Sequence, residues 1–152
     1  MRTIAVSDIH GHAQTLMALL QKIDYKPNED RLFLLGDYVD GGPDSLGTVR
    51  AVMDLCAQDA AKVQVLGGNH DELFLNWLDG NEHRLLPYAN NRTVIFGHDA
   101  CSNLHGNPVL HSPWFGSQII GIDGGIKFGA RLNALLIDES GILTSESLPS
   151  ID

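Results

Sequence analysis

Four short polar clusters in the sequence combine glycine with residues that bind metal ions or transfer protons. The clusters span residues 7–11, 36–42, 67–72 and 97–99. Their donor atoms are carboxylate oxygens, an amide oxygen and imidazole nitrogens, and no cysteine lies among them. This donor set suits divalent manganese, iron, zinc or nickel, and it argues against Cu(I) or an iron–sulfur centre.

The spacing within these clusters allows particular residues to share an ion. Asp8 and His10 are two residues apart, so on an extended segment their side chains point the same way and can chelate one ion. Asp37 offers a carboxylate that can bridge two ions, and Asn69 adds an oxygen without adding negative charge. Such a site can stay net positive although the chain is acidic.

An apolar run precedes each cluster and predicts a β-strand that would position it. The predicted strands are residues 3–6, 31–35, 63–66 and 93–96. After each of the first three clusters comes a segment with helical periodicity, and the next predicted strand follows that segment. The three segments span about residues 13–24, 45–58 and 71–79. Alternating strands and helices predict a parallel sheet, in which neighbouring strands end at one edge. We therefore expect the four clusters to converge.

Two further patterns complete the expected elements. Asp44 or Ser45 is the expected N-cap of the second helix. The residues expected to face the core from this helix are Leu46, Val49, Met53 and Cys56. Later in the chain, residues 132–137 and 143–145 are predicted to form a hairpin that turns at residues 139–141.

Composition and charge narrow the classes of function. The chain has 152 residues with 43% hydrophobic content, which predicts a single domain over residues 1–152. Its formal charge of −9 disfavours general attraction to nucleic acid or to anionic membranes. Two cysteines and a first segment that resembles neither a signal peptide nor a membrane span predict a cytoplasmic setting.

The clusters also match, in order, the sequence motifs of a known family. The matching residues are Asp8, His10 and Gly11, then Gly36, Asp37, Asp40, Gly42 and Ser45, then Gly68, Asn69, His70 and Asp71, and finally Gly97 and His98. These strings resemble the calcineurin-like metallophosphoesterase superfamily, and within it bacterial serine/threonine-type protein phosphatases and symmetrical diadenosine tetraphosphate hydrolases. The resemblance implies a layered α/β/β/α sandwich, here in a shortened form.

The resemblance implies a role for each matched residue. Two divalent metal ions are expected, with manganese the first expectation and iron, zinc or nickel suited to the same donors. The implied metal ligands are Asp8, His10, Asp37, Asn69 and His98. His70 is implied to be the general acid, held by Asp40, because a carboxylate fixes the imidazole tautomer.

The sequence departs from the family pattern in two places. Gly41 stands where the second motif normally carries an arginine that binds phosphate, and Arg84, Arg92 and Arg131 are the candidate replacements. Residues 70–97 contain no apolar strand ending in the further histidine that normally binds the second metal. The candidate substitutes for this histidine are His83, His105 and His111, from this subunit or another.

Together these features predict a metal-dependent phosphoesterase that uses a metal-activated water, with His70 as general acid. The expected substrate is a phosphomonoester, a phosphoprotein, a nucleotide or another small phosphoester, and neither nucleic acid nor membrane is an expected partner. The alternative is a catalytically degraded metal- or phosphate-binding module with a regulatory or interaction role. A shortened fold would also expose apolar surface, so self-association into a homo-oligomer is a further hypothesis.

Overall fold

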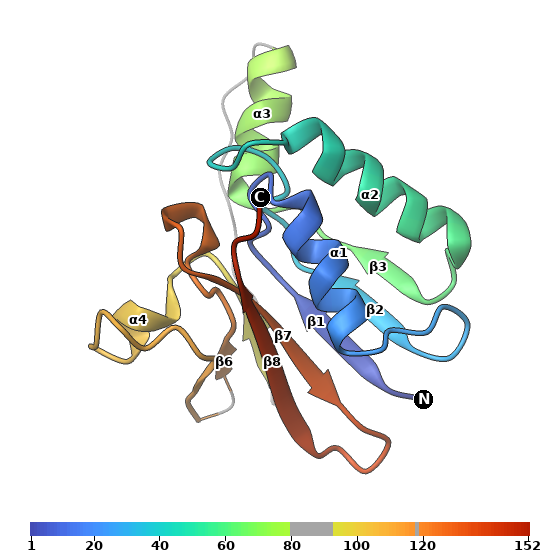
Figure 1. Ribbon diagram of the computed structural model, residues 1–152, viewed down its shortest axis with the longest axis vertical. Coiled ribbons are helices and arrows are strands. Elements are labelled where there is room, and N and C mark those ends of the chain that lie inside the picture. Colours follow the sequence, from blue (N-terminus) through green and yellow to red (C-terminus); the bar gives the residue numbers. More distant parts are fainter. Residues whose placement is uncertain (80–92, 118) are drawn as a thin grey trace.

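A computed structural model describes residues 1–79, 93–117 and 119–152. Two sheets form its centre, and helices cover one of them (Figure 1). The larger sheet has five strands in the order β3-β2-β1-β7-β8, and the smaller has three in the order β4-β6-β5. Within the described residues, no helix is long and apolar enough to cross a membrane.

The first half of the chain forms alternating strands and helices, as predicted. The elements are β1 (Thr3–Val6), α1 (Ala13–Lys22), β2 (Arg31–Leu34), α2 (Ser45–Gln58), β3 (Val63–Val65) and α3 (Asn69–Asp79). β1, β2 and β3 are parallel, with Ile4 opposite Leu32 and Leu32 opposite Val63. α2 begins after Asp44, whose side chain accepts a hydrogen bond from the Gly47 amide at 2.7 Å.

The second half completes the larger sheet and builds the smaller one. Its elements are β4 (Val94–Phe96), α4 (Cys101–Leu104), β5 (Trp114–Phe115), β6 (Ile119–Gly121), the 3-10 turn η1 (Ile126–Phe128), β7 (Arg131–Ile137) and β8 (Leu143–Pro149). β7 pairs antiparallel with both β1 and β8, which confirms the predicted hairpin. β4 was expected to extend the parallel sheet, but it pairs with β6 in the smaller sheet.

Alternate side chains of the central strands pack into two different cores. Ile4 and Val6 of β1 lie in the core between the larger sheet and the helices α1 and α2. Ala5 instead packs with Ile120 and Leu135 between the two sheets. The layers are therefore helix, sheet, sheet and the single turn α4, whose Cys101 thiol bonds the Gly121 carbonyl at 3.3 Å. This is the predicted α/β/β/α sandwich with a reduced last layer.

Candidate metal and phosphate site

The loops that follow β1 and β2 run side by side beyond the sheet. The amide of Asp8 donates to the Gly36 carbonyl at 3.1 Å, and the amide of His10 donates to the Asp37 carbonyl at 2.7 Å. A third bond joins the Gly11 amide to the Tyr38 carbonyl at 2.8 Å. These bonds extend the parallel pairing past the strand ends and so place the first two clusters against each other.

Five of the seven predicted site residues have left-handed backbone conformations. The φ angles are +55° for Asp8, +45° for His10, +54° for Asp37, +67° for Asp40 and +77° for His98. Residues with a Cβ adopt this region rarely, although aspartate and histidine are more common there than most. Such strain is maintained by surrounding structure and gathers at functional sites. It supports the interpretation that these loops are built around a site.

His10 presents one ring nitrogen toward Asp37. The His10 Nδ1 atom lies 2.9 Å from the Asp40 carbonyl oxygen and 3.2 Å from the Val39 carbonyl oxygen. Because both carbonyl oxygens can only accept a hydrogen bond, Nδ1 carries the proton. Nε2 is then the lone-pair nitrogen, and it lies 3.9 Å from Asp37 Oδ2. A hydrogen bond that fixes the tautomer in this way is typical of histidines that bind metals.

Asp71 connects the loop after β2 to the start of α3. Its Oδ2 accepts hydrogen bonds from the amides of Asp37 at 2.7 Å and Gly68 at 2.9 Å. Its Oδ1 accepts from the amides of Tyr38 at 2.8 Å and Val39 at 3.3 Å. Sequence reasoning placed Asp71 in a motif but gave it no role, because three of its four partners are backbone amides distant in sequence.

His70 and Asp40 form the predicted pair. His70 Nδ1 lies 2.8 Å from Asp40 Oδ2, so a proton on Nδ1 is directed at the carboxylate. The amide of His70 also donates to Asp37 Oδ1 at 2.8 Å, which ties the pair to the loop after β2. Lys127, which sequence reasoning did not assign to the site, has its Nζ 2.9 Å from His70 Nε2.

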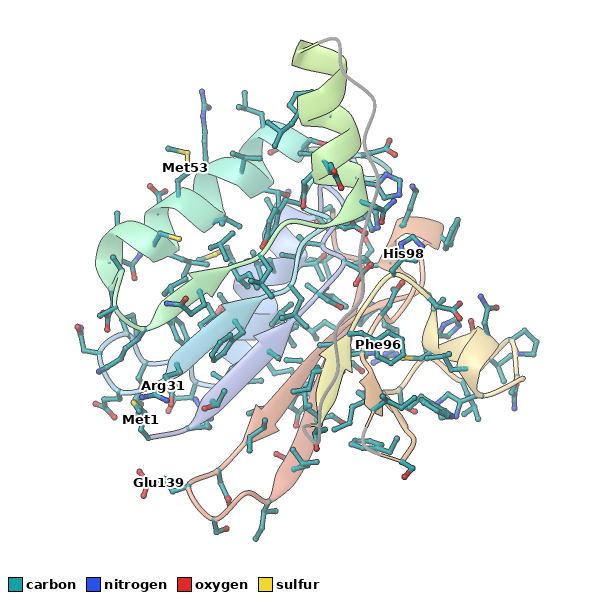
Figure 2. The ribbon with its side chains drawn as sticks, turned by 180° about the vertical axis from the view of Figure 1, so that it is seen from behind. Met1, Arg31, Met53, Phe96, His98 and Glu139 are labelled. Atoms are coloured by element: carbon teal, nitrogen blue, oxygen red, sulfur yellow. The ribbon has the colours of Figure 1, made fainter. Side chains whose placement is uncertain are left out.

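The last predicted ligands meet at the end of β4. Figure 2 shows His98 just beyond this strand, below the first turn of α3. His98 Nδ1 lies 2.7 Å from the side-chain oxygen of Asn69, and the His98 amide donates to Asp8 Oδ1 at 2.8 Å. The structure thus brings the four clusters together, although β4 belongs to the other sheet. The roles of their residues as ligands stay predictions.

Three carboxylates in this region make its electrostatics unfavourable without a cation. Asp8, Asp37 and Asp123 are all buried. Burial first, and then the charge of Asp123, raise the pKa of Asp8 to about 7. Burial also raises the pKa of Asp123 and lowers the pKa of His10. Sequence reasoning gave Asp123 no role, although it follows β6 much as Asp8 follows β1.

The residues present fit a divalent cation. Ligand atoms of His10 and Asp37 lie within 4.8 Å of one another and of a ring nitrogen of His70, the residue implied to be the general acid. Gly68 and Gly97 pack so closely on the carboxylates of Asp37 and Asp8 that a Cβ on either glycine would overlap them. Oxygen and imidazole donors of this kind suit Mn²⁺, Fe²⁺, Zn²⁺ or Ni²⁺.

Two of the candidate substitutes that lie in the described part of the chain have partners elsewhere in the fold. Among the described residues, His105 bonds the Ser112 carbonyl at 3.0 Å, and Arg131 donates to the Ser147 hydroxyl at 2.9 Å in the β7–β8 hairpin. The ring of His111 is different, because its Nδ1 is buried and has no hydrogen-bond partner among the described residues. His105 and Arg131 therefore have other partners. His83, Arg84 and Arg92 lie outside the described residues.

Relatives are similar to this chain over part of their length. A symmetrical bis(5'-nucleosyl)-tetraphosphatase of Cellvibrio japonicus is 41% identical over 71 residues, which cover 47% of this chain and 25% of the relative. One from Shewanella baltica is 38% identical over 99 residues, covering 65% of this chain and 34% of the relative. The matched part therefore spans about a quarter to a third of these relatives.

Solved structures share the fold over nearly the whole chain. A putative diadenosine tetraphosphatase superposes with a TM-score of 0.67 at 21% identity, covering 96% of this chain and 93% of that one. A cold-active protein-tyrosine phosphatase from a Shewanella species gives 0.64 at 15% identity, covering 97% and 80%. The family model for calcineurin-like phosphoesterases matches residues 1–144. The chain therefore belongs to the calcineurin-like phosphoesterase family.

Proposed function

We propose that this protein hydrolyses phosphoesters in a metal-dependent reaction. The observation that carries the proposal is the convergence of four strand-end clusters beside the His70–Asp40 pair. Asp8 and His10 would hold one ion, Asp37 would bridge, and Asn69 and His98 would hold a second. When bound, such ions lower the pKa of a coordinated water and neutralise charge on phosphoryl oxygens.

His70 would supply the proton that the leaving oxygen requires. Its Nδ1 is bonded to Asp40, so Nε2 is the atom that can exchange a proton with substrate. Asp40 fixes the ring and stabilises the protonated imidazole, which is the arrangement that general acid catalysis needs. A site that only bound metal or phosphate would have no use for this pair.

A cleft beside His70 indicates which leaving groups fit. The cleft has a volume of about 720 Å³ and is lined by His70, Asp40 and several apolar side chains. The apolar residues are Val39, Leu46, Val49 and Phe74. Because the general acid faces the leaving oxygen, the leaving group lies on this side of the phosphorus. We therefore favour an aryl phosphate, whose leaving group is aromatic, or a bis(5'-nucleosyl) tetraphosphate, whose phosphoanhydride cleavage would release a nucleotide.

The test is hydrolysis of an aryl phosphate with Mn²⁺ and with excess chelator, together with a count of metals per chain. We expect activity with Mn²⁺, loss with chelator, and loss in Asp37→Ala. Asp54→Ala removes an exposed aspartate on α2 and should behave like the unaltered chain. Activity that survives both chelator and Asp37→Ala would refute the proposal. Metal or phosphate binding without turnover of an aryl phosphate, a phosphoserine peptide or the tetraphosphate would support the binding module instead.

A further inference from the structure

Lys127 reaches the centre of the site from η1, far along the chain from the motif residues. Its Nζ lies 2.9 Å from His70 Nε2 and 3.3 Å from Asp40 Oδ2. Among the described residues, no other lysine or arginine forms an ion pair with the predicted site residues. The side chain is 24% exposed, so its ammonium is sheltered yet open to a ligand.

Gly41 provides the space that this lysine occupies. A Cβ on Gly41 would lie 2.7 Å from Lys127 Cγ and 3.3 Å from both Cδ and Cε. The φ angle of Gly41 is +94°, a conformation that disfavours any residue with a Cβ. Glycine at this position therefore lets the lysine stem pass across the loop and reach the His70–Asp40 pair.

The position of the ammonium matches where a substrate phosphate must lie. His70 Nε2 is the nitrogen that would face the leaving oxygen, and Lys127 Nζ contacts that same nitrogen. Lys127 Nζ also lies 3.4 Å from His70 Nδ1, so the ammonium sits beside the imidazole and within reach of both ring nitrogens. A phosphate whose leaving oxygen faced Nε2 would therefore lie within reach of this ammonium, which can donate a charge-assisted hydrogen bond to a phosphoryl oxygen.

We propose that Lys127 binds the phosphoryl group of the substrate, exchanging its contact with His70 for one with a phosphate oxygen. The inference rests on the proposed function, because it assigns a phosphate ligand to the same site. The ammonium is free to make this exchange, because its ion-pair partner Asp40 is 63% exposed and 3.3 Å away, so Lys127 is not held in a buried ion pair. The arginine expected in the second motif is thereby replaced by a lysine from a different loop, a candidate that sequence reasoning did not consider.

The test measures phosphate affinity directly, by calorimetry with inorganic phosphate on the Mn²⁺-loaded chain, alongside the kinetics of aryl phosphate hydrolysis. In Lys127→Gln we expect the dissociation constant for phosphate and the KM to rise about tenfold or more, because a charge-assisted hydrogen bond is lost. Lys127→Arg should restore most of the affinity, since guanidinium also binds phosphate. The matched control is Lys22→Gln, which removes an exposed lysine paired with Glu146.

Three results separate this inference from the proposed function. Unchanged phosphate affinity in Lys127→Gln, with hydrolysis by the unaltered chain intact, would overturn the role of Lys127 alone. A fall in kcat without a change in phosphate affinity would also overturn it, because Lys127 would then only orient Asp40. Phosphate binding that depends on Lys127 in a chain without hydrolytic activity would support the inference and refute the proposed function. Metal content and urea unfolding should be equal in all variants.

Discussion

Replacing Asp71 with asparagine should disrupt the loop that carries Asp37. In the native chain the two carboxylate oxygens accept four backbone amides, at 2.7, 2.8, 2.9 and 3.3 Å. Asparagine keeps one acceptor oxygen and turns the other into an NH₂ group, which would face two amide donors. The substitution therefore removes about two hydrogen bonds to a charged acceptor and adds a repulsive contact.

The expected loss of stability follows from these contacts. A hydrogen bond to a charged group contributes about 1.5–3 kcal/mol. Asp71 is partly exposed, so hydrogen bonds to water would replace part of the lost stabilisation. We expect the free energy of unfolding to fall by about 2–4 kcal/mol. For a chain of 152 residues this lowers Tm by roughly 5–15 °C. Activity should also fall at least tenfold, because the loop positions Asp37 and the His70 amide bonds to it.

Glu72→Gln is a matched control because Glu72 is the next residue in the same first turn of α3. It loses the same charge, and its side chain makes no hydrogen bond or ion pair to the described residues. A negatively charged side chain near a helix N-terminus stabilises the helix by about 0.3–1 kcal/mol, and both variants lose this contribution. Urea and thermal unfolding would measure the difference. Equal stability of the two variants would show that the four amide contacts are not what holds the loop.

Three further predictions concern other parts of the molecule. His70→Ala should slow hydrolysis about 10²–10⁴-fold with metal content unchanged by elemental analysis, and an equal loss of metal would make His70 a ligand instead of the general acid. Burial would raise the pKa of Asp30, but hydrogen bonds from Arg2 and a backbone amide lower it below 3.8. The stability from the Asp30 carboxylate is therefore present above about pH 4 and lost as pH falls, and urea titrations of Asp30→Asn should show a weaker acid dependence. Asp152→Ala removes the acceptor for two amides at the start of α1 and should cost about 1 kcal/mol in urea unfolding, whereas unchanged stability would show that the cap is not needed.

The strands and the hairpin could be predicted because their sequence signals are local. β1 is an apolar run that ends in a polar cluster, and both of its faces are covered in the structure. The start of α2 was predicted because Asp44 is a strong N-cap residue and its partner Gly47 is three residues away. Signals of this kind can be recognised without knowing which helices and strands pack against each other.

The buried face of α2 was predicted only in part, because two sets of residues have helical spacing. Leu46, Val49, Met53 and Cys56 were expected to face the core; Val49 and Cys56 pack against it, but Leu46 is 60% and Met53 is 64% exposed. The buried residues are Thr48, Val52 and Leu55. Thr48 can be buried because its hydroxyl donates to the Asp44 carbonyl at 3.0 Å. Apolarity misled at Leu46, which lines the cleft beside His70 and does not face the core.

The predicted site residues share one property that Lys127 lacks, and it explains the limit of sequence reasoning. Each of them lies in a polar cluster that follows a strand, so the strand that positions it can be recognised locally. Lys127 lies 57 residues from His70, and its place depends on how η1 folds back over Gly41. Two unpredicted residues nevertheless change the charge of the site: Asp123 adds a third buried carboxylate to those of Asp8 and Asp37, and Lys127 adds a cation beside Asp40 and His70. One lysine cannot offset three carboxylates. An anionic substrate therefore requires bound cations as well as Lys127, and the same residues that attract metal would repel phosphate without it.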